Sequence, residues 1–387
     1  MSLRLFKQLS FTILRHFAAA RYRRLLHGAT PNCILVLQYT MPLGGCVHVT
    51  PLFAALHDGL PQLPVYVATR ALGAEVLRHN PNIAGLIITP DVFSDLHGAG
   101  KALSSALHQK NLRPGWIITD AGNRRTRIAL LATLYCGAPM VGFNLAEALQ
   151  SITLRRDVQR SMIENNLQIA HVLGADSMPR EPRMYTSQKD IESARQLLAE
   201  VNPRSLPVVV FSSQPSGGQP TAWWPERWAP VVQYIVAQNL LPIFVGTAHQ
   251  SAAIDHIRNL AGVSSATVAG RTHIGMLSAL LALSDLCISI DTGTLHVARA
   301  VDLPCVALAP TFQTPVEWLP IQWPKARVLR GEGIYPSSPD YHLDEIEPSS
   351  VIAATDELLH HYPADTASRE QRVQIIQQAI DHLATLP

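Results

Sequence analysis

Short apolar runs rich in β-branched residues alternate along most of the chain with segments that have the apolar spacing of a helix. The strands predicted in the N-terminal half are Cys33–Tyr39, Val65–Thr69, Gly85–Pro90, Trp116–Asp120 and Met140–Phe143. The helices predicted between them are Val47–Leu56, Ala71–His79, Asp95–Lys110 and Arg124–Cys136. Apolar strands that alternate with helices indicate a parallel sheet, because crossover helices must cover both of its faces.

A polar connecting region, Leu145–Pro207, has helices predicted at Ser161–Leu173 and Asp190–Glu200, and the alternation then begins again. Its strands are predicted at Val208–Ser213, Leu241–Gly246, Ala266–Ala269, Asp285–Ile290, Cys305–Ala309 and Arg327–Leu329. Its helices are predicted at Pro225–Gln238, Ala252–Leu260, Ile274–Ser284, Thr294–Val301, Ser349–His360 and Thr366–Leu386. The expected fold class is therefore α/β, with two Rossmann-like, doubly wound parallel-sheet domains whose C-terminal strand edges face a cleft.

This pattern predicts that the chain is divided into four segments. Residues 1–28 form an N-terminal helical segment, and residues 29–200 form the first domain with its connecting helices. Residues 205–348 form the second domain, and residues 349–387 form C-terminal helices. A chain of 387 residues that is 47% hydrophobic is long and apolar enough to build two domains of ordinary size.

Charge and cysteine content exclude several classes of function. A net charge of +2 gives no reason to expect a nucleic-acid partner. The five cysteines are widely spaced and form no C-x-x-C pair, and the 16 histidines form no H-x-x-x-H motif. We therefore expect neither a disulfide framework nor a metal site, and a cytoplasmic location.

The N-terminal segment has an unusual charge distribution, because residues 1–57 contain no Asp or Glu. Residues 1–28 carry six cationic side chains, and residues 3–17 carry eight large apolar ones. No apolar run there approaches the roughly 20 residues that a membrane span needs. The segment is predicted to be a basic amphipathic helix on the anionic inner-membrane surface, as in a peripheral membrane protein. The alternative is a helix that packs on the first domain and leaves its basic face in water.

The most informative motif is a turn between a strand and a helix, Asp291-Thr292-Gly293. A helix N-terminus directs its N–H groups and positive dipole end at an anion, and Gly293 lets the backbone approach it closely. Thr292 and Thr294 add hydroxyl groups, and His296 lies within reach of the same anion or of a sugar hydroxyl. Asp291 can accept hydrogen bonds from a sugar, or it can cap the helix. A capped turn without any ligand is the alternative interpretation.

The longer pattern D-T-G-x-x-H-x-A-x-A, followed by a strand and a segment that ends at Trp318, resembles the C-terminal signature of glycosyltransferase family 9, the ADP-heptose:lipopolysaccharide heptosyltransferases. Further similar segments are Gly270–Thr272, Trp224–Trp228, Leu241–Gly246, Ile34–Leu56 and Asp120–Leu130. The resemblance covers about residues 32–360.

This resemblance implies a GT-B fold and an inverting, metal-independent transfer of a heptose from a nucleotide-sugar donor to a lipid-linked glycan, the lipopolysaccharide core. It implies no cofactor. It places the donor, an ADP-heptose-like molecule, on the second domain, against Asp291, Thr292, Gly293, Thr294, His296, Ser212, Ser213 and Gln214. Met276 lines the base pocket or is ordinary core. The acceptor falls to the first domain, near Gly44, Gly45, Arg124 and Arg127; a solvated helix start is the alternative interpretation of the two arginines.

Three positions depart from the family pattern. Gly44-Gly45 stands where the family has Gly-Asp, whose aspartate is the family's general base. Ala222 replaces a lysine that faces the donor phosphates, and His249-Gln250-Ser251 replaces the acidic residue that holds the ribose. These departures keep two other hypotheses open. One is a non-catalytic relative that binds sugar nucleotides or partner enzymes as a scaffold, and the other is a nucleotide-sugar epimerase.

A transferase of this sequence needs another general base, because Gly45 has no side chain. Asp120 follows a predicted strand, and the arginines at positions 124, 125 and 127 are expected to keep it ionised. His48 is the second candidate because the intrinsic pKa of histidine is near neutral. The alternative is that Asp120 only caps the helix that follows it.

Overall fold

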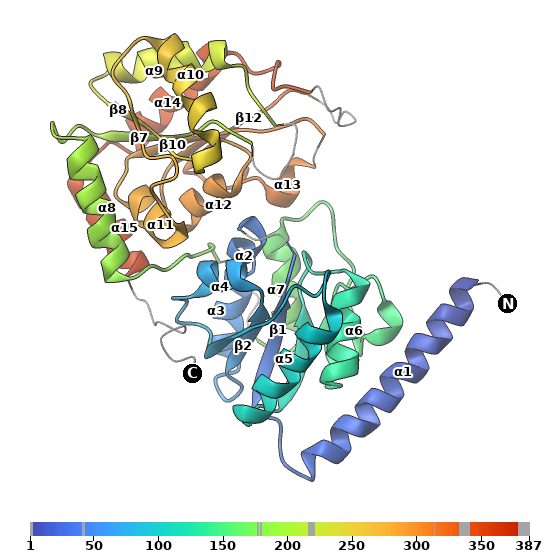
Figure 1. Cartoon of the computed structure of the whole chain (residues 1–387). Helices are drawn as coiled ribbons and strands as arrows, with labels where there is room; N and C mark the ends of the chain where they lie inside the picture. Colours follow the sequence, from blue (N-terminus) through green and yellow to red (C-terminus); the bar gives the residue numbers. More distant parts are fainter. Residues whose placement is uncertain are drawn as a thin grey trace. The chain divides into compact units, whose positions relative to one another are not determined.

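The computed structural model describes residues 3–40, 43–175, 178, 180–215, 221–312, 314–332 and 341–377. The chain divides into two compact units, the first ending at Pro182 and the second beginning at Arg183 (Figure 1). Each unit is built on a parallel sheet of six strands.

The sheet of the first unit has the strand order β3-β2-β1-β4-β5-β6. Its strands are β1 (Cys33–Gln38), β2 (Val65–Thr69), β3 (Gly85–Ile88), β4 (Pro114–Thr119), β5 (Met140–Gly142) and β6 (Ile152–Thr153). Strand β6 has only two residues at the sheet edge, too few for any periodicity, and the sequence did not predict it. The chain runs outward from β1 to β3, returns to β4 beside β1, and then runs outward on the other side.

Helices cover both faces of this sheet, as the continuous apolar strands predicted. They are α1 (Leu3–Leu26), α2 (Gly44–His48), α3 (Thr50–Gly59), α4 (Ala71–Leu77), α5 (Leu96–Gln109), α6 (Thr126–Tyr135), the 3-10 turn η1 (Glu147–Leu149) and α7 (Met162–Val172). Leu35 and Leu37 of β1 pack with Ile117 of β4 against α5 and α6 in one apolar cluster. The opposite face is covered by helices that include α3, which packs on α7.

Two helices of the first unit differ from the prediction. The single helix expected from Val47 to Leu56 is two helices, α2 and α3, separated at Val49. Helix α6 begins at Thr126 instead of Arg124, because the carbonyl oxygen of Arg124 accepts a hydrogen bond from the N–H of Leu145. A contact distant in sequence thus decided where α6 begins.

Helix α1 packs on the first unit along one side, near α6 and η1. Ala18 and Tyr22 are buried, and the Tyr22 hydroxyl donates a hydrogen bond to the Pro114 carbonyl at 2.7 Å. Gly137 has a φ of +86°, and a Cβ there would lie 2.7 Å from the Ala18 carbonyl oxygen. A glycine is therefore needed where the helix approaches the α6–β5 connection.

The second unit repeats the same topology, with the strand order β12-β11-β10-β7-β8-β9. Its strands are β7 (Val208–Ser212), β8 (Leu241–Phe244), β9 (Ala266–Thr267), β10 (Leu286–Ile290), β11 (Cys305–Leu308) and β12 (Ala326–Leu329). The chain again runs outward on one side of its first strand and then returns to the other side. Both sheets therefore have the Rossmann strand order 3-2-1-4-5-6.

The helices of the second unit are α8 (Gln188–Val201), α9 (Pro225–Ala237), the 3-10 turn η2 (Ala248–Gln250), α10 (Ser251–Ala261), α11 (Ile274–Ala282), α12 (Gly293–Ala300), α13 (Pro315–Trp318), α14 (Pro348–His361) and α15 (Thr366–Ile376). In Figure 1, α9, α10 and α14 lie on one side of the sheet and α11 and α12 on the other. Helix α9 begins with Pro225 in its first turn, as its sequence predicted.

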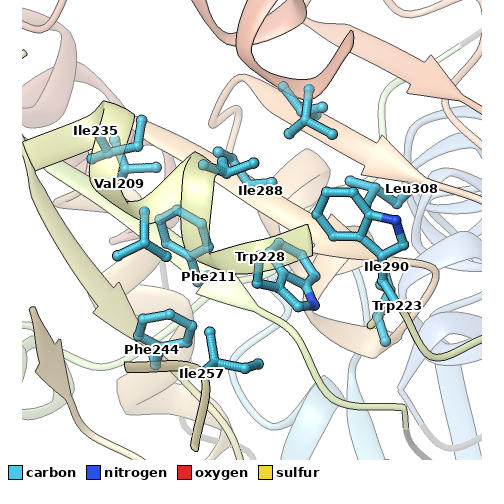
Figure 2. Close-up of a cluster of buried hydrophobic side chains, with 14 of the residues drawn as sticks. Val209, Phe211, Trp223, Trp228, Ile235, Phe244, Ile257, Ile288, Ile290 and Leu308 are labelled. Carbon is cyan, nitrogen blue, oxygen red and sulfur yellow. The ribbon is translucent and has the colours of Figure 1, made fainter. Parts of the chain in front are cut away.

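The core of the second unit is aromatic at its centre (Figure 2). Alternate residues of β7, Val209 and Phe211, point to the same face of the sheet. Phe211 stacks on Phe244 of β8, with ring centroids 5.0 Å apart. Trp228 of α9 meets the edge of Phe211 at 5.9 Å and is fully buried.

The connecting region belongs to the second unit from Arg183 onward, whereas the sequence placed the boundary near residue 200. The reason is that α8 packs on α11. Helix α8 also begins earlier than expected, at Gln188, because Ser187 and Asp190 form a capping box. The terminal helix α15 packs on the same unit: Arg372 donates hydrogen bonds to the carbonyls of Ala282 and Ser284. The part of the predicted tail helix from residue 378 to 386 lies outside the described residues.

None of the helices in the described part of the chain combines the length and the apolar character that crossing a bilayer requires.

The aromatic centre of the second unit should dominate its stability. Replacing Trp228 with Ala should lower the free energy of unfolding by about 3–5 kcal/mol, because a large buried ring leaves a cavity. Urea unfolding followed by circular dichroism measures the change. Trp224→Ala is the matched control: Trp224 is 42% exposed, and its loss should have a much smaller effect. Equal effects of the two substitutions would contradict this view of the core.

Candidate functional site

The strand order reverses at one place in each sheet, and most of the predicted site residues lie on the connections that start there. In the first unit the reversal lies between β1 and β4, and in the second between β7 and β10. Connections from neighbouring strands leave such a point in opposite directions, which opens a crevice at the C-terminal ends of the strands. Ligands of open α/β sheets bind in this crevice.

In the second unit, a cluster of hydroxyl groups lies at the reversal. Ser212 ends β7, and Thr292 follows β10. The Oγ of Ser212 and the Oγ1 of Thr292 share a hydrogen bond at 3.2 Å, and the Oγ of Ser289 lies 3.3 Å from the same Thr292 atom. All three residues are buried. We call Ser212, Ser289 and Thr292 the hydroxyl cluster; sequence reasoning missed Ser289, which is the second-last residue of its strand.

Helix α12 begins at Gly293, directly beside the hydroxyl cluster. Thr292 is its N-cap residue, but the Thr292 side chain makes no capping hydrogen bond to the helix. Its hydroxyl points instead to Ser212 and Ser289. Thr294 is half-buried in the first turn of the helix. The structure therefore joins a helix N-terminus, which attracts anions, with hydroxyl groups that can donate hydrogen bonds.

His296 and Asp291 are both buried beside this helix start. The Nε2 of His296 lies 3.9 Å from the Oδ1 of Asp291, beyond hydrogen-bond distance. Burial, with a smaller contribution from the Arg299 charge, lowers the pKa of His296 to about 4. The imidazole is thus neutral near pH 7, and the two side chains do not form an ion pair. A neutral imidazole can donate or accept a hydrogen bond.

The other residues predicted for this site lie at its margin or on another connection. Ser213 is buried after β7, and Gln214 donates a hydrogen bond to the Ser213 hydroxyl at 3.3 Å. Met276 is half-buried in the first turn of α11, on a different strand–helix connection. Gln250 caps its own turn and donates a hydrogen bond to the carbonyl of Pro215, so it ties the β8 connection to the β7 connection.

In the first unit, the reversal is filled by buried amides around Asp120. The Oδ1 of Asn123 accepts hydrogen bonds from the N–H groups of Tyr39 and Thr40, at 2.7 and 2.9 Å. Its Nδ2 donates to Gln38 and, at 2.8 Å, to the Oδ2 of Asp120. Asn123 therefore clamps the end of β1 to the end of β4.

The same network reaches the glycine turn and α7. Gln38 donates a hydrogen bond to the carbonyl of Gly45 at 3.2 Å. Asn166 of α7 accepts one from the N–H of Ala121 and donates one to the carbonyl of His48. We call Gln38, Asn123 and Asn166 the amide network. Sequence reasoning missed all three residues, and the one available signal was that Gln38 is a polar residue at the end of an apolar strand.

Asp120 is 2% exposed, and its carboxylate takes part in three hydrogen bonds with the chain. Burial raises the pKa of Asp120 to about 6, although the bonds from Gly122 and Asn123 lower it. The expectation that the nearby arginines keep it ionised stays a prediction. Asp120 does not cap α6: the N-cap residue of that helix is Arg125, and Asp120 closes the turn at residues 120–123.

His48, Arg124 and Arg127 lie on the segments that follow β1 and β4. His48 is buried at the end of α2, whose first two residues are Gly44 and Gly45. Arg127 is in the first turn of α6 and donates a hydrogen bond to the carbonyl of Phe93. The carbonyl of Arg124 fixes the loop that contains Leu145.

Across the described ranges, no three histidine, cysteine, aspartate or glutamate side chains gather in a way that could hold a metal ion. The five cysteines, all of them in described residues, are buried and form no disulfide.

A family model for glycosyltransferase family 9 (heptosyltransferase) matches residues 123–340, more than half of the chain. The chain belongs to glycosyltransferase family 9. The match includes the hydroxyl cluster, the start of α12 and Asn123, and it begins after the Gly44-Gly45 turn. Membership in this family supports a sugar-transferring enzyme.

Solved structures similar to this family 9 chain include other members and heptosyltransferases. The family 9 glycosyltransferase of Veillonella parvula is 20% identical, with a TM-score of 0.76, and the match covers 85% of this chain and 98% of the other. The E. coli ADP-heptose lps heptosyltransferase II is 20% identical with a TM-score of 0.66, covering 85% and 99%. E. coli heptosyltransferase WaaC with ADP-2-deoxy-2-fluoro heptose is 15% identical with a TM-score of 0.62, covering 84% and 99%. No protein in the curated set matches this chain.

These similarities confirm the α/β fold class with two Rossmann-like parallel sheets, as in the GT-B-like heptosyltransferases.

Asn123 should be essential for the stability of the first unit. Asn123→Ala removes four hydrogen bonds and leaves buried groups of Tyr39, Gln38 and Asp120 without this partner. Each unsatisfied buried group costs about 1–3 kcal/mol, so we expect a loss of at least about 3 kcal/mol in the free energy of unfolding. Chemical denaturation measures it, with Asn259→Ala at an exposed position of α10 as the control. A loss no larger than that of the control would mean that water replaces the amide without penalty.

Proposed function

We propose that this chain transfers a heptose-like sugar, with inversion and without a metal ion, from an ADP-heptose-like donor to a hydroxyl of a lipid-linked glycan such as the lipopolysaccharide core. One observation carries the proposal. The turn at Asp291–His296, which bears the family signature, lies beside the hydroxyl cluster at the strand reversal of the second unit. The E. coli neighbours whose structures contain ADP or an ADP-heptose analogue have the same type of fold.

The donor diphosphate would bind at the N-terminus of α12. The backbone N–H groups at the start of α12 and the hydroxyls of Thr292, Thr294 and Ser212 would donate hydrogen bonds to the diphosphate and stabilise the negative charge that develops on it as it leaves. Neutral His296 would donate or accept a hydrogen bond without adding charge. Ser213 and Gln214 would complete the donor site from the β7 side, and Asp291 would accept from sugar hydroxyls. Met276 would contact the base.

The acceptor would bind on the first unit, near Gly44, Gly45 and the arginines Arg124 and Arg127, which suit an anionic glycan. In an inverting displacement, the acceptor oxygen forms its bond to the anomeric carbon while the bond to the diphosphate breaks, and a base takes the hydroxyl proton. The acceptor is lipid-linked, so we place the reaction at the cytoplasmic face of the inner membrane.

We assign the base role to Asp120, with His48 as the second candidate. Three features support Asp120. It lies at the strand reversal, it connects to Gly45 through Asn123 and Gln38, and its pKa of about 6 suits proton transfer near neutral pH.

A non-catalytic relative is the second candidate function, and a specific observation favours it. Gly45 has no carboxylate, and Asp120 already accepts three hydrogen bonds from the chain. Such a protein would bind sugar nucleotide but transfer nothing.

Donor binding should depend on Gly293. Gly293→Val places a branched side chain where the diphosphate approaches the backbone, so ADP affinity should fall by about 1–3 kcal/mol from lost hydrogen bonds. Titration calorimetry with ADP measures it. Ala252→Val, at an exposed position of α10, is the control. If both variants bind ADP as the natural protein does, the donor does not bind at this turn.

Turnover should depend on Asp120. Asp120→Asn keeps the shape of the side chain and should reduce turnover by about 10²–10⁴-fold, with donor affinity unchanged. A base must be ionised, so the rate of the natural protein should fall as the pH drops below about 6, and the variant should lose this dependence. Transfer is measured with a panel of ADP-linked sugars and a lipopolysaccharide-core acceptor.

His48→Ala is the parallel test of the second candidate base. If neither substitution slows transfer, both assignments fail. If the natural protein binds donor without transferring it, and Gly45→Asp creates transfer, the non-catalytic function is the correct one. Interconversion of the sugar without any acceptor would reveal an epimerase.

A further inference from the structure

Helix α1 has two apolar sides, and the structure covers only one of them. The covered side carries Phe11, Leu14, Ala18 and Tyr22, at spacings of three, four and four residues, and it packs on the core of the first unit. Arg15 and Arg21 add hydrogen bonds to the carbonyls of Gln150 and Leu134. The helix is therefore held firmly by this side. The sequence predicted a helix with one apolar face, and the second face appears only once the first is seen to be buried.

The uncovered side carries Phe6, Leu9, Ile13 and Phe17, again at spacings of three, four and four residues. We call these four residues the outer stripe. At about 100° per residue, the outer stripe lies on roughly the opposite side of the helix from the packed residues. Each of the four is about half exposed or more, and Phe17 is 73% exposed. Ile13, Phe17 and Ala20 also line a shallow, mostly apolar hollow with Thr12 and His16.

Such a concentration of exposed apolar side chains is unusual for this molecule. Of the 14 large apolar side chains that are exposed in the described residues, five lie on α1: the outer stripe and Leu25. The others are scattered over both units, and single exposed apolar residues need no explanation. A contiguous apolar stripe does need one, because leaving it in water is unfavourable.

The charges around the outer stripe identify what covers it. Lys7, Arg23 and Arg24 are exposed on the same helix, and Arg24 continues the outer stripe seven residues after Phe17. Residues 1–57 contain no acidic side chain. Two copies of this helix would therefore bring cations together with no acid to pair with them, which disfavours self-association. An anionic lipid surface offers both an apolar layer for the stripe and negative charge for the flanking cations.

We propose that the outer stripe of α1 docks on an anionic membrane surface, with the helix parallel to the surface and the first unit fixed to its other side. Phe6, Leu9, Ile13 and Phe17 enter the boundary between headgroups and acyl chains, and Arg23 and Arg24 contact anionic headgroups. The inference does not depend on the proposed transferase activity, because docking requires neither donor nor acceptor.

The test is vesicle sedimentation of the full-length chain. Vesicles that mix phosphatidylglycerol with phosphatidylcholine should bind it, phosphatidylcholine alone should bind it much more weakly, and added salt should weaken binding. Replacing Phe6, Leu9, Ile13 and Phe17 together with Gln should reduce binding at least about ten-fold. Replacing Arg23 and Arg24 with Gln should reduce it by about five-fold per residue.

The matched control replaces Leu72 and Leu260 with Gln, since both are exposed leucines on helices other than α1, and it should bind vesicles normally. Thermal unfolding of the stripe variant should match that of the natural protein, because its packed side is intact. Undiminished vesicle binding by the stripe variant, or equal binding to neutral vesicles, would overturn the proposal. So would a dimer of the natural protein that the stripe substitutions dissociate without changing vesicle binding. ADP affinity of the stripe variant should be unchanged, which separates this test from that of the proposed function.

Discussion

The structure depends above all on the burial of two parallel sheets on both faces. A parallel strand can be followed by another only through a crossover, so helices must return the chain across the sheet each time. All strands then end at the same edge. Where the order reverses, between β1 and β4 and again between β7 and β10, the connections diverge and leave room for other groups. The positions of both candidate sites follow from this one constraint.

The two units fill that room in different ways. In the second unit, Ser212, Ser289 and Thr292 present small hydroxyls beside an uncapped helix start. A hydroxyl can rotate to donate or accept, so this cluster can exchange its internal hydrogen bonds for bonds to a ligand. In the first unit, Asn123 and Asn166 hold fixed backbone groups of three segments. Such a hydrogen-bonded amide network gives rigidity and fixes the position of Asp120, whose pKa is raised by burial although its bond with Asn123 lowers it.

Helix α1 differs from the other helices because one of its two apolar sides is exposed. Its packed side uses the same kind of apolar spacing as the core helices, but its outer stripe remains in water in the isolated chain. Because α1 packs firmly on the first unit, holding α1 at a surface also holds the sheet at whose edge Asp120 lies. Membrane docking through the outer stripe would thus hold the proposed acceptor side of the enzyme close to a lipid-linked substrate.

The sequence by itself determined the elements and the family. Apolar strands such as Val208–Ser212 and Cys33–Gln38 are encoded by local runs of β-branched residues, and the D-T-G turn is contiguous in sequence, so both could be predicted. Features that depend on contacts between residues distant in sequence could not be predicted. Arg124 lies outside α6 because its carbonyl accepts a hydrogen bond from Leu145, and α8 belongs to the second unit because it packs on α11. The amide network consists of Gln38, Asn123 and Asn166, which come from three separate segments. The two sides of α1 show the same difference between what the sequence predicts and what packing decides. The spacing of its apolar residues is local, but only packing on the first unit decided which side is buried and which one remains exposed.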